Sequence, residues 1–193
     1  MKIRRILVLV LALLFLSGCA LMPVQTMDGA QWDRDWLGVG TVLGISPLGH
    51  DLELVEKEDM LAFGSIYYAT WSVGEGEAYE GGEEDEKVYP LQVYLLIQQC
   101  KDGGDPEGEI ALWQKVLQET NEVTGSENRT VNEQAYTTYT YNNLVEGNPY
   151  QRGAAAFTVR GVYAISVEVL GMESYTGDLE QVLSDFLSCM HYR

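Results

Sequence analysis

Basic residues are scarce in this sequence. The chain has 12 lysines and arginines against 29 aspartates and glutamates, which gives a net charge of −17 at pH 7, and three of these bases lie within the first five residues. Phosphate backbones and anionic lipid headgroups repel such a body over any range that salt leaves unscreened. We therefore exclude nucleic acid as a partner. A disordered acidic protein is excluded as well, because 46% hydrophobic and 10% aromatic residues can bury a core.

Histidines and nucleophile motifs are also scarce. His50 and His191 are the only two histidines, and the serine at position 46 lacks the final glycine of a Gly-x-Ser-x-Gly turn. These residues give poor support to a serine or cysteine hydrolase. We predict a protein without enzymatic activity, catalytic residues or cofactor. A cell-surface hydrolase that uses His50 beside Asp51, or a loop acid, is the alternative.

Metal-ligand patterns are missing too. The acids of residues 75–86 lack the alternating ligand spacing of a calcium loop, so they favour a solvated hairpin tip. On a helix, Cys189 and His191 would point about 200° apart, which disfavours a soft metal site shared with Cys100. We expect no metal site. A metal- or solute-binding receptor is the third alternative.

The only long apolar run lies at the amino terminus. Lys2, Arg4 and Arg5 precede eleven uninterrupted apolar residues, 6–16, and Ser17, Gly18 and Cys19 follow. An eleven-residue helix is about 16 Å long, roughly half the thickness of a bilayer's hydrocarbon core. The run is therefore too short for a permanent span, and it predicts a cleaved export signal over residues 1–18.

The residues Leu16-Ser17-Gly18-Cys19 resemble the bacterial lipobox. The resemblance implies that Cys19 becomes the lipidated first residue of the mature chain, as in lipoproteins of the Firmicutes type. Two or three acyl chains on one thiol would hold the protein stably, whereas a single chain holds only marginally. The protein is then expected on the extracytoplasmic face of the cell membrane. Ala20 favours the outer membrane in a cell that has two.

Beyond the signal, the chain is long enough for one domain. Residues 19–35 contain Pro23 and Gly29 and show no sustained period, so they predict a tether. Residues 36–193 then predict a single globular domain, because the remaining length leaves little room for a second one.

The first half of the domain has the pattern of strands. Short extended segments are expected near residues 40–45 and 52–55. Residues 60–73 and 88–98 are rich in β-formers and enclose a glycine- and acid-rich stretch, which predicts a long hairpin with an acidic tip. In the second arm, Val93, Leu95 and Ile97 form one fully apolar face while the opposite face is half apolar. A sheet covered on both sides is the expected result.

The second half of the domain alternates helices and strands. Asp105 and Pro106 predict a helix start, and an apolar stripe continues to about Thr120. Residues 121–130 are polar and predict turns, residues 131–141 a strand, and residues 154–169 a second hairpin that turns at Arg160-Gly161. The last helix is expected to start at Asp178 and to include Met190.

This order predicts an α+β fold: an antiparallel sheet built from hairpins with two main amphipathic helices packed on it. The order, with the strand Thr130-Val131-Asn132-Glu133-Gln134-Ala135-Tyr136 between helix and second hairpin, resembles the PsbP-like α/β/α sandwich superfamily. Lipoproteins of the DcrB and LpqN types belong to it, and the resemblance covers about residues 36–193. It implies an accessory, assembly or binding role outside the cytoplasm, and no catalytic motif comes with it.

Two thiols remain once Cys19 is assigned to the anchor. Cys100 and Cys189 are an even number in a compartment that permits disulfides. A bond between them would stabilise the fold by roughly 4–5 kcal/mol in the chain-entropy model. The alternative is two buried thiols.

Altogether we expect a lipid-anchored protein with a non-catalytic binding or envelope-assembly role, held to the membrane through Cys19, with a protein of the cell envelope as partner.

Overall fold

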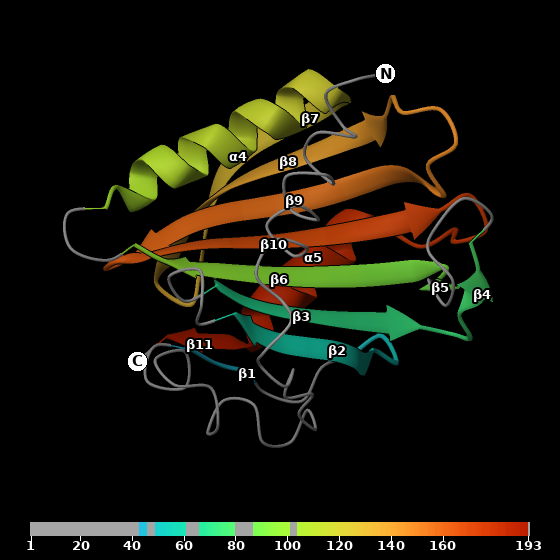
Figure 1. Cartoon of the computed structure of the whole chain (residues 1–193), viewed down its shortest axis with the longest axis horizontal. Helices are drawn as coiled ribbons and strands as arrows, with labels where there is room; N and C mark the ends of the chain where they lie inside the picture. Colours follow the sequence, from blue (N-terminus) through green and yellow to red (C-terminus); the bar gives the residue numbers. More distant parts are fainter. Residues whose placement is uncertain (1–42, 46–48, 61–65, 80–86, 101–103, 193) are drawn as a thin grey trace.

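A computed structural model of the chain describes residues 43–45, 49–60, 66–79, 87–100 and 104–192 (Figure 1). A seven-stranded antiparallel sheet forms its centre, in the order β2-β3-β6-β10-β9-β8-β7. The strands are β2 (Glu53–Met60), β3 (Ile66–Val73), β6 (Leu91–Gln99), β7 (Asn121–Val131), β8 (Gln134–Asn143), β9 (Tyr150–Arg160) and β10 (Tyr163–Met172). Two helices, α4 (Pro106–Thr120) and α5 (Leu179–Cys189), pack on this sheet. The predicted α+β fold class is confirmed.

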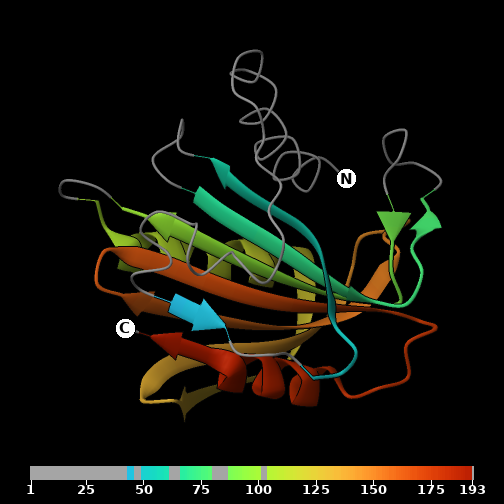
Figure 2. The ribbon, with the colours of Figure 1, turned by 90° about the horizontal axis from the view of Figure 1, so that it is seen from below.

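The two helices cover opposite faces of the sheet. In β10, Ile165 belongs to the core cluster beneath α5 and Ala164 to the cluster beneath α4, because neighbouring side chains of a strand point to opposite faces. The α5 cluster is the larger one, and in it the Phe186 ring lies edge-on to Trp71 with centroids 5.1 Å apart. Figure 2 shows α5 on one side of the sheet. The β6 residues Val93, Leu95 and Ile97 belong to the α5 cluster, whereas the α4 cluster takes its sheet residues from β8, β9 and β10.

Both predicted hairpins are present. β3 and β6 pair from Ile66↔Gln98 to Val73↔Leu91, and the short strands β4 (Glu77–Ala78) and β5 (Lys87–Val88) form a separate ladder beyond them. Residues 80–86, which hold most of the predicted acidic tip, lie outside the described residues. The second hairpin, β9 and β10, turns after Arg160 at Gly161, whose φ of 57° is in the left-handed region that glycine adopts readily.

The helix starts agree with the sequence, but their caps differ. Asp178 precedes α5, and its Oδ1 accepts hydrogen bonds from the backbone N–H groups of Glu180 at 2.9 Å and Gln181 at 3.2 Å. Asp105 precedes α4 without any side-chain cap hydrogen bond, and Pro106 begins that helix. At the other end of α4, the Asn121 side-chain amide donates to the Leu117 carbonyl at 2.9 Å.

Three predictions along the chain are wrong. Residues 121–130, expected to form turns, belong to the eleven-residue strand β7. The turn lies instead at Asn132 and Glu133, which both have positive φ, so it interrupts the strand expected over residues 131–141 and β8 begins only at Gln134. β7 is polar because it lies at the edge of the sheet, where most of its side chains meet water. Met190 does not continue α5. It begins β11 (Met190–Tyr192), which pairs with β1 (Leu43–Ile45), and this pairing replaces the last helical turn.

The predicted export signal, the tether and Cys19 fall within residues 1–42, outside the described residues. Among the helices that are described, none is both long enough and apolar enough to cross a membrane. The strands β1 and β11 lie on the same side of the sheet as α5 (Figure 2).

Candidate functional site

The sheet opens at one end between β8 and β9. Their backbone ladder runs from Asn142↔Arg152 only as far as Thr137↔Phe157, although both strands continue beyond that pair. Side chains bridge the remaining gap. The Thr158 hydroxyl donates to the Ala135 carbonyl at 2.6 Å, and the Gln134 amide donates to the Val159 carbonyl at 3.1 Å. The separation of the two strands leaves a pocket, which we call the β8–β9 pocket.

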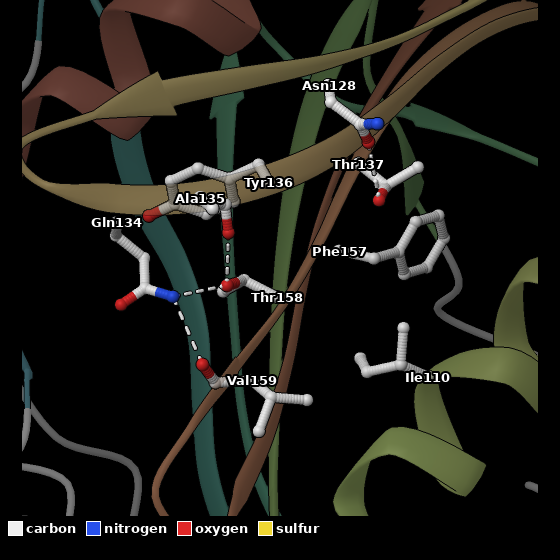
Figure 3. A pocket seen from close by; sticks show the side chains of 9 residues that line it. All are labelled: Ile110, Asn128, Gln134, Ala135, Tyr136, Thr137, Phe157, Thr158 and Val159. Atoms are coloured by element: carbon white, nitrogen blue, oxygen red, sulfur yellow. Dashed lines mark hydrogen bonds between the residues drawn. The ribbon is translucent and has the colours of Figure 1, made fainter.

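The β8–β9 pocket has a volume of about 320 Å³ and an uncharged lining. Figure 3 shows Ile110 and Phe157 on one side of the opening and Gln134 on the other. The residues that line it are Ile110, Asn128, Gln134, Ala135, Tyr136, Thr137, Phe157, Thr158 and Val159. Burial raises the pKa of the Tyr136 hydroxyl to about 12, so this side chain is neutral as well. A charged group would lose its hydration here without meeting a counter-charge, which favours neutral groups.

A second pocket lies between the outer strands and α5. It has a volume of about 230 Å³ and is lined by Gly125, Ser126, Glu127 and Arg129 of β7, by Thr138, Tyr139 and Thr140 of β8, and by Glu180 and Leu183 of α5. The Arg129 guanidinium contacts the Glu127 carboxylate and lies 4.0 Å from a carboxylate oxygen of Glu180. Two carboxylates face one guanidinium, so this β7–α5 pocket carries a net negative charge and favours a cation.

β7 contributes to both pockets. Asn128 lines the β8–β9 pocket and receives the Thr137 hydroxyl hydrogen bond at 3.0 Å, while Glu127 and Arg129 line the β7–α5 pocket on the other face. Sequence reasoning missed this strand, because its polar residues show no apolar period. One signal in the sequence could have identified the strand: the polar stretch is long and continues directly from a helix into a β-rich segment.

The structure gives His50 a partner distant in sequence. Its Nε2 lies 2.5 Å from Oδ2 of Asp185 on α5, and the Gln181 amide donates to the other oxygen of that carboxylate at 2.7 Å. The adjacent Asp51 is therefore not the acid that orients the ring. His50 lines neither described pocket, and His191 lies on β11, whose backbone pairs with Gly44. Within the part of the chain that the structure describes, neither histidine lines either of these two pockets.

Cys100 and Cys189 are not joined to each other by a disulfide in this structure. Cys100 is buried at the end of β6, where its backbone N–H donates to the Val162 carbonyl at 2.8 Å. Burial raises the pKa of the Cys100 thiol, with a smaller contribution from Glu109, and burial followed by Asp185 raises the pKa of Cys189. A raised thiol pKa lowers the fraction of thiolate, which is the form that attacks a substrate or binds a metal. Among the described residues, no three His, Cys, Asp or Glu side chains are grouped to hold a metal ion.

No protein-family model matches the sequence, and a search of curated proteins found no match. Several solved structures are similar in fold, among them the following two. The solution structure of cyanobacterial PsbP (CyanoP) from Synechocystis sp. PCC 6803 has 14% identity and a TM-score of 0.40, with 77% of this chain and 98% of that chain covered. The crystal structure of LpqN, involved in cell envelope biogenesis of Mycobacterium tuberculosis, has 8% identity and a TM-score of 0.45, with 78% and 82% covered. Identities and TM-scores this low transfer neither a residue role nor a function to this chain.

Proposed function

We propose that this chain is a lipid-anchored protein of the extracytoplasmic membrane face with a non-catalytic binding or assembly role in the cell envelope. The observation that carries the proposal is the order of the amino-terminal residues: three bases, the apolar run 6–16 and the lipobox-like ending at Cys19, followed by a strongly acidic chain. The first part directs export and supplies the thiol for acylation. The acidic remainder of the chain is repelled by anionic headgroups, which favours its position in the aqueous phase.

The composition of the pockets supports binding over catalysis. The β8–β9 pocket offers hydroxyl, amide and apolar groups, and the β7–α5 pocket adds two carboxylates and a guanidinium. These are groups that recognise a partner. Hydrolysis would call for a base beside a nucleophile in the pocket, and neither pocket lining includes a histidine; His50 contacts the carboxylate of Asp185 outside both linings.

Replacing the acylated thiol tests the anchor. In a bacterial host with the lipoprotein-processing enzymes, the wild-type chain should be found in the membrane pellet, with an acylated Cys19 as the first residue by mass spectrometry. Cys19→Ser should move the protein out of that pellet, because a hydroxyl takes no thioether-linked lipid. Cys100→Ser is the matched control and should leave the protein in the membrane. An uncut, unmodified amino terminus, or retention of Cys19→Ser in the pellet, would contradict the proposed anchor.

A further inference from the structure

β7 is an open edge of the sheet. Within the described residues it pairs with β8 alone, and Ser126, Glu127, Asn128 and Thr130 are exposed. In an antiparallel edge strand, every other residue directs its N–H and C=O groups outward, away from the neighbouring strand. These outward groups are a template for a further strand.

The devices that usually block an edge are weak in β7. The strand contains neither proline nor lysine, the two residues that most often prevent pairing. Its one irregularity lies between Val123 and Gly125. From Gly125 to Val131 the register with β8 is continuous, so seven residues of regular edge are available.

The two sheet faces beside this edge differ in charge. Arg129 faces α5, since it lies 4.0 Å from Glu180, and with Glu127 these three side chains have a net negative charge. Asn128 faces the other way, into the uncharged β8–β9 pocket. A strand added to β7 would direct alternate side chains to these two faces. It would lie about 4.8 Å outside β7, so only a long side chain could extend from it to Glu180.

We propose that β7 binds an extended segment of a partner protein as an eighth strand, and that this segment alternates basic with uncharged residues. The basic side chains lie on the α5 face near Glu127 and Glu180, and the uncharged ones lie beside Asn128. Backbone hydrogen bonds supply affinity and the alternation supplies specificity. A second copy of this chain is a poor occupant, because its own net charge of −17 is repelled.

A matched set of peptides tests the proposal. The probe is an acetylated and amidated nine-residue peptide that alternates Lys and Val, titrated at low salt into the full chain in non-ionic detergent. The first control alternates Glu and Val. The second is the Lys-Val peptide with N-methyl groups on alternate residues, which removes backbone donors and keeps the charge. We expect each control to bind at least about tenfold more weakly, and the Lys-Val peptide to slow hydrogen exchange of amides in residues 125–131.

A charge reversal at Glu180 tests whether the peptide binds beside β7. Glu180→Lys should weaken the Lys-Val peptide by about tenfold or more and strengthen the Glu-Val peptide. Glu53→Lys changes the net charge equally on β2 at the opposite edge of the sheet, and it should leave both affinities near wild type. Circular dichroism and thermal midpoints confirm that both variants fold.

Three results would overturn the proposal: equal binding of the N-methylated peptide, equal weakening by Glu53→Lys, or concentration-dependent dimers that protect residues 125–131 without peptide. The proposal rests on the proposed binding role and is independent of the lipid anchor. Loss of peptide binding leaves the fractionation of Cys19→Ser unaffected, and a failed anchor leaves the titration unaffected, so the two failures can be told apart.

Discussion

At the scale of single residues, Gly153 leaves the least room for a Cβ among the described glycines. A Cβ at this position would overlap the ring of Tyr141, which is 2% exposed and whose hydroxyl donates to Glu168. Gly153→Ala should therefore lower the free energy of unfolding by about 1–3 kcal/mol, as overpacking does. Urea unfolding measures the change. Gly49→Ala is the control, because a Cβ there meets nothing within 4 Å. Equal stability of the two variants would show that the ring can move aside.

Residue partnerships were the least predictable part of the sequence. The scarcity of histidine directs attention to His50, yet its carboxylate partner lies 135 residues away on α5. Nothing local identifies Asp185, because a distance between remote residues depends on the tertiary fold. The same holds for the thiols: the apolar-face position of Cys189 predicts partial burial, whereas its separation from Cys100 depends on the tertiary fold.

At the scale of elements, the two helix starts differ in a way that stability measurements can detect. Asp178→Ala removes two hydrogen bonds to backbone N–H groups at the start of α5, and it should lower the free energy of unfolding by about 0.5–2 kcal/mol. Asp105→Ala removes an aspartate at the corresponding position of α4, where the side chain makes no cap hydrogen bond. Its effect should be smaller. A larger loss from Asp105→Ala in denaturant unfolding would contradict this difference.

Elements with one apolar face were predictable, and those without were not. The stripe Val182, Leu183, Phe186 and Leu187 identifies α5, and all four side chains are buried. The alternation of Val93, Leu95 and Ile97 identifies β6. β7 meets water along most of its length, so burial imposes no period on it. Met190 fits the helical period, but its backbone pairs with Ile45, and this long-range pairing outweighs the local preference.

At the scale of the whole molecule, like charges dominate the surface. The net charge of −17 makes the compact state repel itself, and salt screens this repulsion. The thermal midpoint should therefore rise when sodium chloride is increased from about 10 mM to about 200 mM, the range over which the Debye length falls from about 30 Å to below 10 Å. Scanning calorimetry at both concentrations measures the shift. A midpoint that falls with salt would mean that attractive pairs outweigh the repulsion.

The arrangement of the whole was partly predictable. Apolar residues on both faces of β6 indicate a sheet covered on two sides. Helices do lie on both faces, although the α4 cluster contains residues of β8, β9 and β10 and none of β6. The order of the strands was not predictable, because the sequence shows which segments are extended but not which become neighbours. Both pockets depend on that order: one arises where β8 and β9 separate, and the other lies between α5 and the outer strands β7 and β8.

The pairing of β1 with β11 has a mechanical consequence. The described chain enters the fold through β1, which is held by three residue pairs to the strand that follows α5, and the turn after it is fastened by His50 to Asp185. With the proposed attachment upstream, a pulling force between the cell surface and a bound partner acts on the β1–β11 pair before it acts on the seven-stranded sheet. The β1–β11 pair would separate first, starting at Leu43 and Tyr192, and the seven-stranded sheet would stay folded under the same force.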